Sequence, residues 1–133
     1  MHDAVDIAMD LISNGEYESA FHLLRQAAEN TSLGSERRAD AYQVMGALVQ
    51  IVPQLGDGDE SGLSFYKCAL AIAPDHLWAS IGVISTFGDL PYQHKDEAAF
   101  LAAEAVARRQ WSQLDEAART EVNQKRQEFN AVA

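Results

Sequence analysis

The sequence predicts an all-α protein built from antiparallel helix pairs. Apolar residues recur three and four positions apart over most of the 133 residues, which is the period of an amphipathic helix. β-Branched residues are scattered and do not alternate with polar ones, so strand patterns are scarce. Stretches rich in glycine, proline, asparagine or serine separate the periodic segments. The expected helices span residues 2–13, 17–29, 36–52, 60–72, 76–87, 95–111 and 113–129.

Residues that favour helix ends flank these segments. Asn14-Gly15 closes the first helix, because both residues tolerate positive φ. Ser35 is expected to cap the third helix, and Pro53 to stop it. His76 is expected at the start of the fifth helix as a capping or surface residue. Ser112 and Asp115 form a capping-box pattern before the last helix.

The apolar residues of each helix indicate which side is buried. Ile7 belongs to the apolar face of the first helix, and Trp78 is expected inside the protein with Ile81 and Ile84. The last helix is polar around most of its surface, as expected of a helix that covers the end of a stack. Its thin apolar stripe consists of Leu114, Ala118, Val122 and Phe129.

Three stretches share a spacing of small and large residues. Small residues let helix backbones approach closely, and large ones fill the gaps between them. In residues 1–34 the pattern is formed by Ala8, Gly15, Tyr17, Ala20, Leu24 and Ala27. A second copy over residues 39–74 uses Tyr42, Met45, Gly46, Val49, Phe65, Tyr66, Ala69 and Pro74. A third, degenerate copy begins near Trp78, with Ile81 and Gly82.

This spacing resembles the tetratricopeptide repeat over about residues 1–110. The chain departs from the family pattern by a longer first loop, an insertion at 53–59 and an extra stretch around 91–95. The resemblance implies a short α-solenoid of about three helix pairs with a C-terminal capping helix. It implies one domain, 1–133, with repeats at about 1–34, 35–74 and 75–111 and a cap at 112–133.

The resemblance also implies a mode of binding. Stacked helix pairs curve, and the first helix of each pair lines the inner side, where a peptide or a helix of another protein binds. The pattern lacks the paired basic residues that would clamp a peptide's terminal carboxylate. No catalytic residue and no cofactor is expected. The expected partner-binding residues are Asp6, Met9, Ser13, Asp40, Gln43, Ala47, Gln50, Ala79, Val83 and Thr86.

The charge distribution favours a basic partner. The net charge is −10, and residues 1–94 hold 13 acidic and 4 basic residues, whereas residues 95–133 hold 7 and 6. Such acidity repels phosphate backbones and anionic lipid, so neither nucleic acid nor a membrane is an expected partner. The alternative explanation is that the acidity only keeps the protein in solution.

Three features resemble weak ligand sites. Residues 57–62 open like an EF-hand calcium loop, but Cys68 stands where the closing glutamate is required, so an acidic turn is expected. His2, Asp6 and Asp10 share a helix face, as do Glu18 and His22, yet a strong metal site needs three or four converging ligands. We therefore expect no metal. Cys68 itself is expected to be a small buried residue rather than a reactive thiol.

Other kinds of binding protein fit the same features. An immunity or antitoxin-type inhibitor of a toxin and a small acidic bacterial secretion chaperone are alternatives to a general interaction module. We expect no enzyme, because the sequence has no glycine-rich phosphate loop and no nucleophile elbow. A single cysteine, no basic leader and no apolar run near ~20 residues predict a cytoplasmic protein. The oligomeric state stays open.

Overall fold

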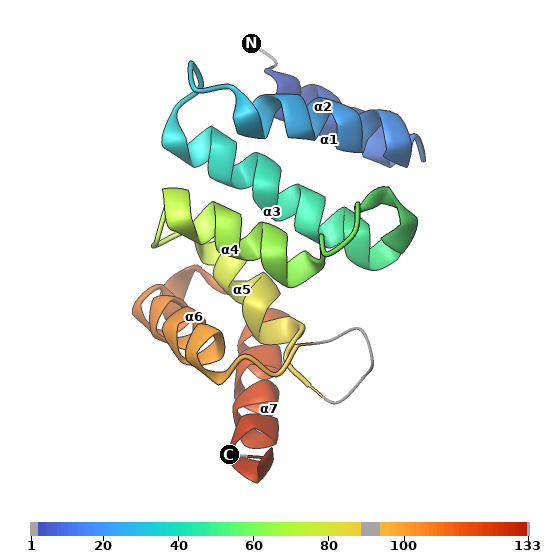
Figure 1. Cartoon of the computed structure of the whole chain (residues 1–133). Helices are drawn as coiled ribbons and strands as arrows, with labels where there is room; N and C mark the ends of the chain where they lie inside the picture. Colours follow the sequence, from blue (N-terminus) through green and yellow to red (C-terminus); the bar gives the residue numbers. More distant parts are fainter. Residues whose placement is uncertain (1–2, 89–93, 133) are drawn as a thin grey trace.

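The computed structural model describes residues 3–88 and 94–132, which form an all-helical protein (Figure 1). Within these residues the only β-type pairing is an isolated bridge between Phe87 and His94. None of the described helices is both long and apolar enough to cross a membrane. Two 3₁₀ turns, η1 (Pro53–Leu55) and η2 (Trp111–Gln113), lie between α-helices. The α-helices are α1 (Ala4–Ser13), α2 (Tyr17–Glu29), α3 (Ser35–Ile51), α4 (Gly62–Ile72), α5 (Leu77–Ser85), α6 (Glu97–Arg109) and α7 (Glu116–Val132).

The helices predicted from the sequence are all present among the described residues, with ends close to the expected ones, but two predicted caps are wrong. The N-cap of α3 is Gly34, and Ser35 is its first helical residue. Ser112 lies inside η2, so the chain turns once more before α7 begins. This turn moves the capping position to Asp115, whose carboxylate accepts a hydrogen bond from the Ala118 N–H at 2.8 Å.

Local chemistry explains where other helices begin and end. Asp3 and Asp6 form a capping box at the start of α1. Gly15 has a φ of 79° after α1, a conformation that glycine adopts at little cost. The ring of His76 caps α5, because its Nδ1 accepts a hydrogen bond from the Ala79 N–H at 3.1 Å. These ends confirm the expected stop at Asn14-Gly15 and the capping role of His76.

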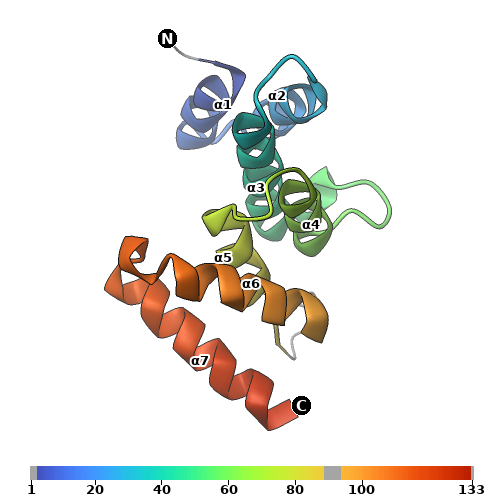
Figure 2. The ribbon, with the colours of Figure 1, turned by 90° about the vertical axis from the view of Figure 1, so that its left-hand side faces the viewer.

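The helices stack along one direction, with α1 and α7 at opposite ends of the molecule (Figure 1). Each helix from α1 to α6 packs against the next, and contacts also join α1 to α3, α3 to α5 and α5 to α7. Figure 2 shows α1 and α3 on one side of the stack and α2 and α4 on the other. α1 and α3 therefore lie side by side on one side of the stack.

The apolar core has two main parts that meet at α4. Phe65 belongs to the cluster shared by α1 to α4, whereas Tyr66 belongs to the cluster that extends to Phe129 of α7. The Tyr66 ring occupies space left by two helical glycines. A methyl group on Gly46 would lie 2.6 Å from Tyr66 Cε1, and one on Gly82 would lie 2.5 Å from Cζ. Because neither glycine carries a side chain, α3 and α5 can pack against the Tyr66 ring of α4 at this short distance.

Three residues expected to be buried are exposed. Ile7 is 45 % exposed, and Val5 is buried in its place, because Val5 continues the arc of Ala4, Ala8 and Ile12 while Ile7 lies at its far edge. Trp78 is 50 % exposed. Cys68 is exposed as well, because the inner side of α4 is occupied by Phe65, Tyr66 and Ala69.

The final helix packs through the thin stripe that the sequence predicted. Leu114, Val122 and Phe129 are buried, and Ala118 packs against the same cluster. The Phe129 ring stacks on Phe100 with 4.8 Å between ring centroids, so it holds α7 onto α6. Phe129 therefore has the structural role expected of a large residue on a terminal helix.

Candidate partner-binding surface

The predicted stripe on α1 is accessible to solvent. Met9 is 46 % exposed, Ser13 is exposed and Asp6 is half-buried. These residues are three and four positions apart, so they share one helix face, and exposed Asp10 lies on that face as well. The stripe combines carboxylates with a flexible thioether side chain, which suits contact with a basic or amphipathic segment.

The predicted stripe on α3 is more enclosed. Asp40, Gln43 and Ala47 are half-buried, and Gln50 is exposed. Gln50 Oε1 accepts a hydrogen bond from the Tyr66 hydroxyl at 3.3 Å. Gln50 is therefore held by α4 and is less available to a partner than the residues of the α1 stripe.

Arg37 joins the two stripes. Its guanidinium donates to both oxygens of Asp3 at 2.7 and 2.8 Å, to Asp6 at 3.0 Å and to Asp40 at 2.8 Å. The hydrogen bond from Arg37 holds the pKa of Asp3 well below its ordinary value, and the same bond raises the pKa of Arg37. One cation thus binds carboxylates from both helices and fixes α1 against α3.

Asp40 also links α3 to α5. Its second oxygen, Oδ1, lies 2.6 Å from Nε2 of His76, which is buried. Because Nδ1 of the same ring accepts the Ala79 N–H, the hydrogen bonds assign the proton to Nε2, which donates to Asp40. His76 is therefore a buried link between α3 and α5, and of the two roles expected for it, capping or surface, the structure shows the capping one.

Glu36, Asp40 and His76 form a cluster that the sequence did not suggest. Their ligand atoms lie within 4.8 Å of one another, a separation compatible with a metal ion. A metal would need the lone pair of Nε2, whereas that nitrogen carries the proton as long as Nδ1 caps α5. The geometry therefore fits a hydrogen-bonded link better than a metal site.

The third predicted stripe is not on the surface. Ala79, Val83 and Thr86 are all buried, so the prediction that they line an accessible wall is wrong for the described fold. Ala79 packs with Ala39, Ala69 and Ala73, while the Thr86 hydroxyl donates to the Gly82 carbonyl at 2.7 Å. The reason is that α5 contacts α3, α4, α6 and α7, so it is covered on most sides.

Paired and unpaired charges are distributed unevenly. Each of the ten lysine and arginine residues interacts within the protein, with carboxylates in most cases and with backbone carbonyls for Arg38 and Arg119. Many carboxylates have no such ion pair within residues 3–88 and 94–132, so the negative excess lies on unpaired side chains. In residues 3–60 these are Asp10, Glu16, Glu18, Glu29, Glu36, Asp57 and Asp59.

The loop that resembles a calcium site is held by protein contacts instead. Glu60 binds Arg25 of α2 through two hydrogen bonds of 2.7 and 3.0 Å, and it also accepts the Asp57 N–H at 2.9 Å. The hydrogen bond from Arg25 lowers the pKa of Glu60. This matches the acidic turn expected from the sequence.

The sequence also singled out two helix faces with possible metal ligands. On the first face, His2 lies outside the described residues. On the second face, His22 pairs with Gln26 at 3.3 Å.

The sequence predicted Asp40 as a partner-binding residue, but it did not predict that Arg37, Asp40 and His76 join the stripes. Arg37 and Asp40 do carry a local signal, because opposite charges three positions apart share one helix face. The links from Arg37 to α1 and from His76 to Asp40 have no such signal, since these partners lie 31 to 36 positions apart in the chain.

Comparison of the chain with protein-family models, with curated proteins and with solved structures gave no match. The case for a binding surface on α1 and α3 therefore depends on the geometry and charge of these residues alone.

Proposed function

We propose that this protein binds another polypeptide, through a basic segment of that partner, on the outer faces of α1 and α3. The proposal includes the finer architecture, a tetratricopeptide-like stack of about three helix pairs closed by α7. In such a stack the first helix of each pair faces the ligand. The alternation of contacts from α1 to α3 to α5 supports this arrangement.

The observation that carries the proposal is the imbalance between paired and unpaired charge. All lysine and arginine side chains interact within the protein, while Asp10 of α1 and Glu36 of α3 form no ion pair with any residue that the structure describes. Carboxylates that have no internal cation attract an external one and speed the encounter with a basic partner. We therefore propose that this surface binds a partner and does not catalyse a reaction.

An exposed apolar side chain beside these carboxylates would add affinity. Met9 is 46 % exposed and shares its face of α1 with Asp6 and Asp10. Methionine is enriched at protein interfaces because its flexible thioether side chain adapts to the partner. The α1–α3 surface thus offers an apolar side chain as well as charge, as an amphipathic partner requires.

The test is a comparison of two charge-reversed variants. Asp10→Lys with Glu36→Lys changes the proposed surface, and Glu116→Lys with Glu121→Lys makes the same change of charge on α7. Both pairs consist of carboxylates that have no ion pair among the described residues, and each pair includes one residue in a first helical turn, Glu36 or Glu116. Parent and variants are used as baits in extracts of the source cell, and each purified partner is then titrated by calorimetry.

We expect a basic protein that binds the parent and the α7 variant equally and the α1–α3 variant at least about tenfold more weakly. The thermal unfolding of all three baits should be similar. Equal binding by both variants would remove the site from α1 and α3, and retention only of acidic or unspecific proteins would reject the proposal.

The form of the partner and the rate and strength of its binding distinguish the three kinds of binding protein. An immunity-type inhibitor should bind one basic protein with an association rate that falls steeply with salt. A secretion chaperone should bind an extended, partly unfolded segment. A general interaction module should bind several short peptides with micromolar dissociation constants.

A further inference from the structure

A cleft lies on the other side of the stack, between α2 and the turn that contains η1. Its volume is about 640 Å³, within the range of ligand clefts in proteins. The cleft is open, and the insertion at 53–59 that distinguishes this chain from the repeat pattern supplies one wall. The lining residues are Glu18, Ser19, Phe21, His22, Arg25, Gln54, Leu55 and Asp57.

The wall formed by the insertion is held in place. Arg25 of α2 binds Glu60 with two hydrogen bonds, and Glu60 in turn accepts the Asp57 N–H. Leu55 packs against the apolar cluster of α1 to α4. The cleft is therefore formed before any ligand arrives, which lowers the entropic cost of binding.

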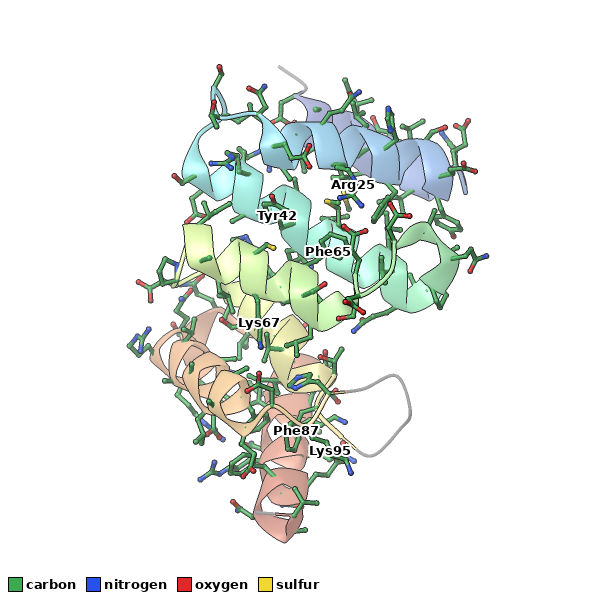
Figure 3. All side chains as sticks on the ribbon, in the orientation of Figure 1. Arg25, Tyr42, Phe65, Lys67, Phe87 and Lys95 are labelled. Atoms are coloured by element: carbon green, nitrogen blue, oxygen red, sulfur yellow. The ribbon has the colours of Figure 1, made fainter. Side chains whose placement is uncertain are left out.

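Aromatic rings lie beneath the charged groups. Phe21 is buried and meets Phe65 edge to face with 5.8 Å between ring centroids. The Arg25 guanidinium lies 5.2 Å from the Phe21 ring and 5.8 Å from the Phe65 ring. Figure 3 labels Arg25 and Phe65. This environment already accommodates one flat cation over aromatic surface.

The net charge of the cleft is negative. Arg25 is balanced by Glu60, so its positive charge is not available to a ligand. Within the described part of the chain, Glu18 on the α2 wall and Asp57 on the loop wall form no ion pair. His22 is exposed and pairs with Gln26. Two carboxylates on opposite walls thus remain to attract a cation.

We infer that this cleft binds the side chain of an arginine or lysine carried by a partner polypeptide. The aliphatic stem would lie against Leu55 and Phe21, and the charged head would lie between Glu18 and Asp57. The site is separate from the α1–α3 surface and goes beyond the function proposed there. The insertion thereby gains a role, because without it the α2 face would have no opposite wall.

The probe is the blocked tripeptide acetyl-Gly-Arg-Gly-amide, titrated into the ¹⁵N-labelled full chain and followed by amide chemical shifts. The control probe carries citrulline in place of arginine, which keeps the shape and removes the charge. We expect concentration-dependent shifts at residues 18–25 and 54–57 with the arginine peptide and none with the citrulline peptide. Shifts with inorganic phosphate at the same residues, and none with the arginine peptide, would identify an anion site and overturn the inference.

Two variants make the test specific. Glu18→Gln with Asp57→Asn removes both carboxylates and should weaken the arginine peptide by about threefold to tenfold. Asp10→Asn with Glu36→Gln removes two carboxylates from the α1–α3 surface and should leave this binding unchanged. Equal weakening by both pairs would mean general attraction to an acidic protein and would overturn the site. Because the probe is a free peptide, this result is independent of whether a partner binds at α1 and α3.

Discussion

The ring of Tyr66 lies directly against the backbone of Gly82, so that a methyl group on Gly82 would stand 2.5 Å from the ring carbon Cζ. Tyr66 is 2 % exposed, and Gly46 approaches the same ring from α3. Added methyl groups on Gly46 and Gly82 would therefore meet the same buried ring from two helices. The contact sets how closely α3, α4 and α5 pack, and through α5 it affects the position of the Asp40–His76 link.

Gly82→Ala and Gly46→Ala should each destabilise the protein. Overpacking costs about 1–3 kcal/mol, while alanine in a helix returns no more than about 1 kcal/mol. We expect a lower melting temperature by circular dichroism. Gly34→Ala is the control for added volume, because nothing lies within 4 Å of its added methyl group and its φ of −62° suits alanine. Gly34 is the N-cap of α3, where alanine is less favourable than glycine by about 1 kcal/mol, so this control sets the loss expected without a clash. Melting temperatures as high as that of the control would show that Tyr66 can move aside.

Tyr66 should make the protein sensitive to alkali. Burial raises the pKa of Tyr66 to about 12 from an ordinary value of 10.0. The folded state holds this proton more tightly than the unfolded chain, so the stabilisation is complete below the ordinary pKa and is lost as pH rises toward 12. Tyr66→Phe should reduce the loss of stability between pH 7 and about pH 11 in urea melts. Tyr17→Phe is the matched control, and identical losses in both variants would contradict the prediction.

Arg37 should contribute less to the stability of the protein in strong acid than at neutral pH. Its hydrogen bond lowers the pKa of Asp3, and a lowered carboxyl pKa gives stability that is present above the ordinary value of 3.8 and is lost as pH falls below it. Arg37→Gln should therefore lower the melting temperature at pH 7, with a smaller difference near about pH 3. Arg109→Gln, which breaks an ion pair with the exposed Asp75, should have little effect at either pH. A constant difference for Arg37→Gln would show that Asp3 is not the group involved.

The Cys68 thiol should react with a thiol reagent while the protein stays folded. Its side chain is exposed, while partial burial, followed by the charge of Glu60, raises the pKa of the thiol. A chromogenic disulfide reagent should modify one thiol in the native protein, more slowly than free cysteine near neutral pH and faster as pH rises. Cys68→Ser should abolish the signal. Reaction only after addition of denaturant would place the thiol in the interior, as the sequence had suggested.

Helix positions could be predicted because their signals are local. The apolar period of three and four and the stops at Asn14-Gly15 and Pro53 depend on neighbouring residues and backbone preferences. The polar last helix with its thin stripe was recognisable for the same reason. The capping residues were predicted less well than the helices. The turn η2 delays the start of α7 by a few residues, so the capping residue is Asp115 and not Ser112.

The prediction that Ala79, Val83 and Thr86 are accessible was wrong, because which side of a helix is buried depends on the elements packed around it. Residues 77–85 contain no charged side chain, a composition that favours a helix covered on most sides. Reading α5 by analogy with α3 placed Trp78 inside and Ala79 outside, whereas the structure has the reverse. The absence of charge in this segment was the available signal for a central helix.

The sequence by itself determined the helical class, the approximate helix limits and the acidic excess, since each follows from residue types and their local spacing. Only the tertiary structure decided which carboxylates are paired. Arg37 binds Asp3 and Asp6, and His76 binds Asp40, because helix packing brings together positions more than 30 residues apart. Among residues 3–88 and 94–132, the same packing left Asp10, Glu36, Glu18 and Asp57 without an ion pair, and ion pairing depends on distances in space that residue order does not record.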